Sequence, residues 1–237
     1  MLLTTVLNAA LRRAWCVALA AALIGCAPSA PKPAPPDSPV TPDFQEDYYR
    51  AARAQGKQVL QIDSRASLIR IVVHRGGRLA RLGHDHVVAS RDVQGQVAPE
   101  AGRADFHFRL DQMTVDEEAL RQQAGFTSQP SAEAIAGTRT NMLTKVLDAE
   151  RYPFVGVQAR GAAADGPMSV SITLHGVTRT MAIPVRMTRG ADGAITVSGA
   201  VSLNQTDFGL VPFAVMGGAI AVENKMDLEF QIVAQAR

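Results

Sequence analysis

Between residues 59 and 234, apolar and polar side chains alternate along the chain with a period of two. This pattern is typical of β-strands that turn one face toward an apolar interior and the other toward water. The alternation is clearest in residues 67–74, 104–110, 168–175, 179–187, 194–203 and 226–234. Gly- and Asp-containing turn signals separate several of these segments, so the pattern predicts a series of antiparallel strands.

Two segments among these strands have the pattern of helices. Thr114 followed by Glu117 forms a capping-box sequence at the start of residues 114–126. The acidic residues that follow Thr114 are expected on a solvated face near the helix N-terminus. Residues 134–153 predict a second, broken helical region that ends before Pro153.

The order of strands, helical insertion and further strands predicts an all-β fold with a helical insertion, built as a barrel or sandwich. An eight-stranded barrel has room either for its own side chains or for one small ligand. Alternation alone does not distinguish a filled barrel from a hollow one, and both interpretations stay open at this point.

Residues 1–25 have the pattern of an export signal, with Arg12 and Arg13 ahead of an apolar core too short to span a bilayer. The sequence Leu-Ile-Gly-Cys that ends at Cys26 resembles the lipobox of bacterial lipoproteins. The resemblance implies cleavage before Cys26, acyl chains such as palmitate on that cysteine, and a place in the periplasm, with Ala27 suiting the outer membrane. An ordinary signal peptide with a chance cysteine is the alternative.

Residues 26–58 follow as a Pro-rich segment that cannot bury a core and is expected to act as an extended tether. Within it, residues 45–57 predict a short helix or more linker, and we expect ordered structure to begin near Val59. The predicted organisation is a signal peptide over residues 1–25, a tether over 26–58 and a β-barrel domain over 59–237.

The charge balance and the motifs of the sequence argue against two functions, nucleic-acid binding and catalysis. Removal of residues 1–25 takes away Arg12 and Arg13 but no acidic residue, which leaves equal numbers of basic and acidic side chains. That balance argues against nucleic acid as a partner. Neither a Gly-rich phosphate loop nor a Gly-x-Ser-x-Gly elbow occurs, so we expect no enzyme.

Four segments resemble the YceI family: residues 61–77, 150–159, 172–185 and 204–232. The resemblance implies a lipocalin-like antiparallel β-barrel, exported from the cytoplasm, that encloses a long apolar cavity for polyisoprenoid chains, including quinones. It attaches no firm enzymatic activity to the fold and implies no required cofactor. Residues 137–148 depart from the usual family sequence, and the Gly-His-Asp-His stretch ending at His86 is not a general family feature.

On this basis the expected partners are an apolar lipid ligand and, through the lipid anchor, a membrane surface. The candidate ligand contacts are the inward-facing strand residues and residues of a possible rim over positions 206–218. They are Phe106, Phe108, Ile172, Leu174, Met181, Ile183, Val185, Val197, Val201, Phe208, Phe213, Met216, Leu228 and Phe230.

His84 and His86 form the remaining candidate site. On a strand both would point to the same side, which suits two ligands of one zinc or copper ion. A third ligand would have to come from His74, His107 or His175, which the sequence does not place nearby. A contact to the ligand's head group and a purely structural role are the other two interpretations. The corresponding alternative functions are a periplasmic metal-binding protein and a non-binding structural envelope protein.

Overall fold

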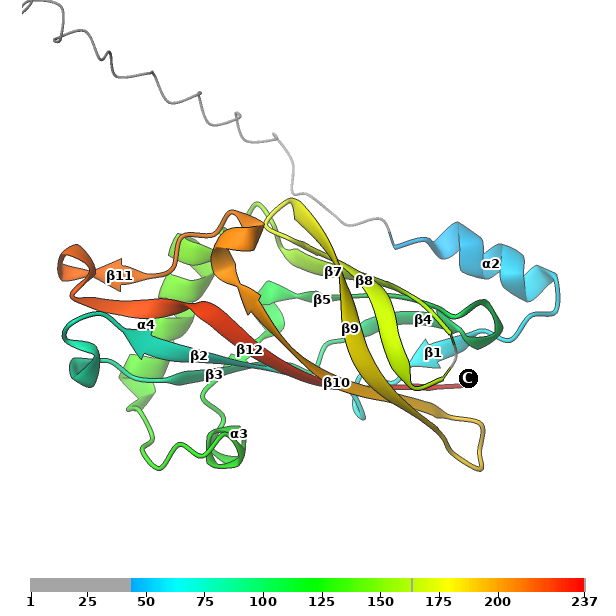
Figure 1. The fold of residues 1–237 in the computed structure, drawn as a ribbon, viewed down its shortest axis with the longest axis horizontal. Helices are drawn as coiled ribbons and strands as arrows, with labels where there is room; N and C mark the ends of the chain where they lie inside the picture. Colours follow the sequence, from blue (N-terminus) through cyan, green and yellow to red (C-terminus); the bar gives the residue numbers. More distant parts are fainter. Residues whose placement is uncertain (1–43, 163, 237) are drawn as a thin grey trace, which may run out of the picture. The chain divides into compact units, whose positions relative to one another are not determined.

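The structure is a computed structural model that describes residues 44–162 and 164–236. Eight antiparallel strands close into a barrel in the order β1-β4-β5-β7-β8-β9-β10-β12, with β12 returning to pair with β1 (Figure 1). Their bounds are β1 Leu60–Ile62, β4 Gln94–Ala98, β5 Arg103–Arg109, β7 Phe154–Arg160, β8 Gly166–Leu174, β9 Val177–Arg189, β10 Ile195–Asn204 and β12 Ile220–Gln235. The predicted antiparallel barrel is confirmed.

A branch of the sheet leaves the barrel along β12. One edge of β12 pairs with β10, while the other pairs with β2 (Leu68–Gly76) before it reaches β1. Strand β2 continues to β3 (His86–Ser90) and β6 (Thr114–Val115), and β11 (Ala214–Val215) pairs with the start of β12. The register between β12 and β2 shifts between Val222 and Met226. A bulge of this kind bends a strand locally.

Helices occupy the connections. The α-helices are α2 (Glu46–Ala54), α3 (Glu118–Gln123) and α4 (Ala132–Asn141), and α4 continues into a π-helical turn, η4 (Met142–Val146). Short 3₁₀ turns are η1 Ala80–Leu82, η2 Pro99–Ala101, η3 Leu110–Gln112, η5 Gln205–Phe208 and η6 Met216–Gly218. Among the described residues, no helix has the length and apolar character needed to cross a membrane.

The apolar core lies inside the barrel, as the alternation predicts. Phe108 and Ile172 are buried on β5 and β8, and Phe106 on β5 packs against the same cluster. Residues of α4 and η4 contribute to this cluster from outside the sheet, with Ile135 and Met142 packed against it. The predicted second helical region therefore forms part of the wall of the core.

The outer face of β5 is covered by the N-terminal segment, which corrects the expected start of ordered structure near Val59. Tyr49 of α2 is fully buried and donates a hydrogen bond of 2.6 Å to Asp105. Phe44 stacks on His107, with the ring centroids 3.8 Å apart, and burial lowers the pKa of that imidazole. Sequence alternation marked this face as polar, but polar residues with partners can be covered by another element.

Asp105 accepts hydrogen bonds from three side chains, of which Tyr49 belongs to α2. Besides Tyr49, Arg103 donates to its carboxylate at 2.7 Å and Arg160 at 2.8 Å. The side chain of Asp105 is only 1% exposed, so its charge depends on these partners. Burial, together with the hydrogen bond to the carboxylate, raises the pKa of Tyr49, which keeps its hydroxyl a donor.

We predict that Tyr49→Phe lowers the free energy of unfolding by about 1–3 kcal/mol, because a buried carboxylate loses one donor. Urea unfolding at neutral pH measures this change. Tyr48→Phe is the matched control, since the contact of Tyr48 with Arg103 is through its ring, 3.8 Å from the guanidinium carbon. Equal effects of the two substitutions would contradict the assignment.

Candidate functional site

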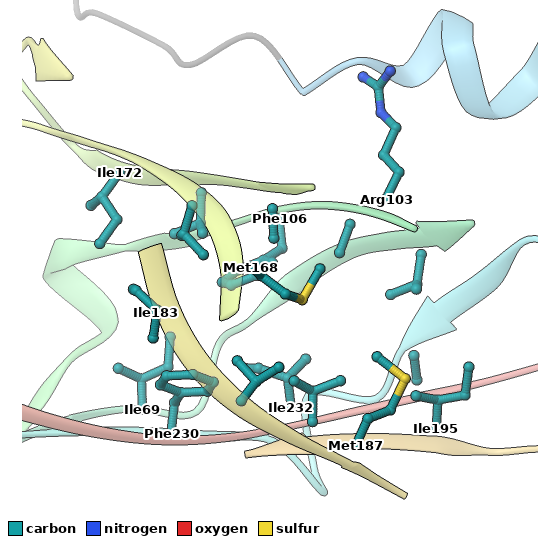
Figure 2. A pocket seen from close by; sticks show the side chains of 18 of the residues that line it. Ile69, Arg103, Phe106, Met168, Ile172, Ile183, Met187, Ile195, Phe230 and Ile232 are labelled. Carbon is teal, nitrogen blue, oxygen red and sulfur yellow. The ribbon is translucent and has the colours of Figure 1, made fainter. Parts of the chain in front are cut away.

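Two adjoining apolar cavities lie in the protein interior, the first of them within the barrel. The first has a volume of about 140 Å³ and is lined by strands β4, β5, β7 to β10 and β12, as Figure 2 shows. The second has a volume of about 260 Å³ and lies between the branch of the sheet, α4 and the segment from η5 to β12. Phe108, Val155, Ile172 and Leu228 line both cavities, so the two share a wall.

The size of these cavities is chemically meaningful. An apolar cavity of roughly 150 Å³ in a protein interior stays dry and takes up a benzene molecule. The smaller cavity here is close to that size and the larger one exceeds it. Because the lining is almost wholly hydrocarbon, the space favours an apolar occupant over water. The barrel is therefore not filled by its own side chains.

Twelve of the fourteen candidate ligand contacts line a cavity. Those on the first cavity alone are Phe106, Ile183, Val185, Val197, Val201 and Phe230, and those on the second alone are Leu174, Phe208 and Phe213; Phe108, Ile172 and Leu228 line both. The aromatic ring of Phe230 lies over Gly199 of the facing strand, where a Cβ atom would approach the ring to 2.7 Å. Because Gly199 has no side chain, the Phe230 ring can occupy this position in the cavity wall.

Met181 and Met216 line neither cavity. Met181 is half-buried against the core on β9. Met216 is 70% exposed in η6, next to Gly217 and Gly218. The predicted rim thus contributes Phe208 and Phe213 to the cavity wall, and its methionine points to the surface.

Many wall residues absent from the candidate set carry the same period-two signal. Ile69, Met168 and Val170 are inward positions of predicted strands. Thr138 and Met142 of α4 and η4 line the second cavity without such a signal, because apolar and polar residues of α4 are not separated by helical period. Their place follows from how the helix packs on the sheet.

Most polar residues at the cavity walls line the second cavity, whereas Arg103 lines the first. The lining of the second cavity includes His84, His86, Thr138, Asn141 and Gln205, together with Arg75. His84 precedes β3 and is exposed, whereas His86 begins β3 and is 9% exposed. The two rings lie 6.1 Å apart between centroids. The structure therefore brings both histidines to one cavity, but in different surroundings.

A buried carboxylate fixes the ring of His86. Asp116 Oδ2 lies 2.6 Å from His86 Nδ1, and Asp116 Oδ1 accepts hydrogen bonds from the Val87 amide at 2.9 Å and from Arg121 at 2.6 Å. Arg121 is itself 2% exposed and also donates to the carbonyl oxygens of Asp85 and Ser128. We expected the acidic residues after Thr114 on a solvated helix face. Asp116 is instead 2% exposed, because His86 and Arg121 compensate its charge.

Asp116 adopts a left-handed backbone conformation, with φ 57°. Its amide donates to the Val87 carbonyl at 2.7 Å, and its own carbonyl accepts from Gln129 at 2.9 Å. Burial alone would raise the pKa of this carboxyl, but hydrogen bonds from His86, Val87 and Arg121 outweigh burial and hold the pKa below its usual value. The carboxylate therefore stays charged at neutral pH.

The other histidines lie apart from this pair. His74 is 3.4 Å from Asp85, His107 stacks on Phe44, and the ring of His175 lies 4.5 Å from that of Tyr152. Within residues 44–162 and 164–236, no group of three or more His, Cys, Asp or Glu side chains is arranged to hold a metal ion. The third donor that a metal site would need is not found among these residues.

The fold is a lipocalin-like β-barrel with an apolar interior. The YceI-like domain family matches residues 61–234, and the chain belongs to that family. A comparison with curated protein sequences gives no significant match.

Two solved structures show the same fold. One is described as a polyisoprenoid-binding domain from Saccharophagus degradans implicated in plant cell wall breakdown. It is 14% identical, with a TM-score of 0.54, and the match covers 75% of this chain and 98% of that one. The other is BcnA from Burkholderia cenocepacia, 15% identical with a TM-score of 0.50, over 73% of this chain and 98% of that one.

We predict that Asp116→Asn lowers the free energy of unfolding by about 3 kcal/mol or more at pH 7, because Arg121 is left buried without its counter-charge. A carboxyl with a depressed folded pKa stabilises above its unfolded pKa of about 4, and this stabilisation is lost as pH falls through the folded pKa. The difference between wild type and variant should thus be constant above about pH 5 and shrink in acid. Urea unfolding across this pH range measures it, and a difference that does not shrink would contradict the prediction.

Proposed function

We propose that this YceI-like domain binds an isoprenoid or a similarly long apolar molecule inside its barrel. The observation that carries the proposal is the pair of adjoining apolar cavities, whose combined volume falls in the range of roughly 300–1,000 Å³ typical of ligand pockets. The polyisoprenoid-binding description of the Saccharophagus degradans relative supports the same ligand class. The role is sequestration or carriage of the ligand rather than catalysis.

Burial of apolar surface supplies the affinity. At about 25 cal/mol per Å² of apolar area removed from water, a chain of several isoprene units gains on the order of 10 kcal/mol before ordering costs. Flexible Met168, Met187 and Met226 lie in the cavity walls and adapt their shape to a flexible tail. A hydrocarbon tail has no polar groups, so an apolar and adaptable cavity wall is sufficient to bind it.

We further propose that the mature protein is lipid-anchored at Cys26 on the periplasmic side of the outer membrane. The support is the lipobox-like sequence after an apolar segment and the Pro-rich stretch that follows it. The signal peptide, Cys26 and most of the predicted tether lie outside the described residues. The metal-binding alternative lacks a third ligand among those residues.

The tail-binding proposal predicts that Val170→Phe weakens binding of a long-chain polyprenol by about tenfold, because the larger ring fills part of the first cavity. Ser169→Phe on the same strand places an identical ring on the exposed outer face and should bind as wild type does. Native mass spectrometry of detergent-solubilised protein titrated with the polyprenol measures both. Failure of wild type to bind polyprenol or quinone, with no extractable lipid from its host, would refute the function.

The anchoring proposal predicts that Cys26→Ser abolishes incorporation of labelled palmitate in the native host, since it removes the thiol that carries the lipid. Cys16→Ser is the control, because Cys16 lies within the apolar segment that cleavage would remove. Labelled palmitate on the Cys26→Ser protein would show that the anchor lies elsewhere or does not exist.

A further inference from the structure

The second cavity has a polar site on its wall, and the arrangement around His86 determines which ring atom faces the ligand. The Nδ1 atom of His86 is hydrogen-bonded to Asp116 Oδ2 at 2.6 Å. The other ring nitrogen, Nε2, has the Thr138 hydroxyl at 3.5 Å, which is longer than a good hydrogen bond, and both residues line the cavity. The cavity wall thus contains His86 Nε2, an imidazole nitrogen that has only one long hydrogen bond within the protein.

The network behind His86 favours one tautomer. Arg121 lies 2.6 Å from Asp116 and balances its charge, so a neutral imidazole keeps this buried group uncharged as a whole. A carboxylate accepts hydrogen bonds only, hence Nδ1 carries the proton. Nε2 then presents its unshared electron pair to the cavity. The strained left-handed backbone of Asp116 is held by hydrogen bonds at both its amide and its carbonyl, so the network orients the ring rigidly.

The charge of the lining disfavours an anionic head group. Among the described residues that line this cavity, Arg75 has the sole permanently charged side chain. Its Nε lies 3.5 Å from a carboxylate oxygen of Asp85, and its guanidinium also donates to the Gly83 carbonyl at 3.2 Å. Because this cation already has a counter-charge, a phosphate would enter an apolar space without one.

We propose that His86, positioned by Asp116, accepts a hydrogen bond from a hydroxyl group on the ligand, with Thr138 as the second polar contact. The head group is therefore an alcohol or a phenol, such as a prenol or a hydroquinone, rather than a phosphate ester or the carbonyl of a quinone. The inference rests on the proposed binding of an isoprenoid tail and adds the chemistry of its head.

The test compares probes with one tail and different heads: geranylgeraniol, its methyl ether, which accepts hydrogen bonds but does not donate them, and geranylgeranyl phosphate. Wild-type protein should bind the alcohol about tenfold more tightly than the ether, and the phosphate no more tightly than the ether. His86→Asn keeps an amide donor beside Asp116 but removes the atom at Nε2 that faces the cavity. It should bring alcohol and ether to nearly equal affinity, with the ether's affinity almost unchanged.

Two further measurements keep the test decisive if His86→Asn folds poorly. Thr138→Val should reduce the preference for the alcohol, whereas Val170→Phe, in the other cavity, should weaken both probes alike. In wild type, ¹⁵N chemical shifts should show a protonated Nδ1 on His86 and a shift of Nε2 when the alcohol binds. Asp116→Asn should lose this single tautomer together with the preference for the alcohol.

The outcomes separate the two proposals. If wild-type protein binds none of the probes, the proposed function fails and the head-group site fails with it. If alcohol and ether bind wild type equally well, tail binding stands and the hydroxyl site is overturned. Tightest binding of the phosphate would likewise overturn it in favour of an anionic head group.

Discussion

The structure depends on the two-sided pairing of β12. Its one edge bonds to β10 over ten residue pairs, and its other edge bonds first to β2 and then to β1. This pairing closes the ring of strands, so their backbone groups pair with one another rather than with water. Closure also forces alternate side chains of every strand into one enclosed space. Strands β2 and β3 leave the ring as a branch (Figure 1). The second cavity lies between this branch and α4.

Within the described part of the chain, two buried carboxylates organise the polar side chains around them. Asp105 faces outward and fixes α2 through Tyr49, with Arg103 and Arg160 as counter-charges. Asp116 lies behind His86 and fixes its ring, with Arg121 as counter-charge. A buried carboxylate is tolerable only when donors surround it, so each one specifies the position of several neighbours at once. One such cluster positions the N-terminal segment, and the other orients the His86 ring at the wall of the second cavity.

The period-two alternation was sufficient to predict the strands and most of the residues that line the cavities. Phe108, Ile172 and Leu228 were identified because a strand sends alternate residues to one face, whatever it pairs with. The same reasoning failed for Asp105 and His107, which share the outer face of β5. Alternation shows which residues leave the interior, but not whether another element then covers them, as α2 and Phe44 do here.

The sequence by itself determined the antiparallel strands, their apolar inner faces and the family, because these depend on local periodicity and on short motifs. Only the tertiary structure decided that the interior contains cavities, since this depends on how far opposite walls stand apart. It also decided the surroundings of His86. The partner that orients this ring is thirty positions away in Asp116, and the hydroxyl beside it comes from Thr138 of α4. No local pattern encodes such contacts, because they arise when separate elements pack on one another.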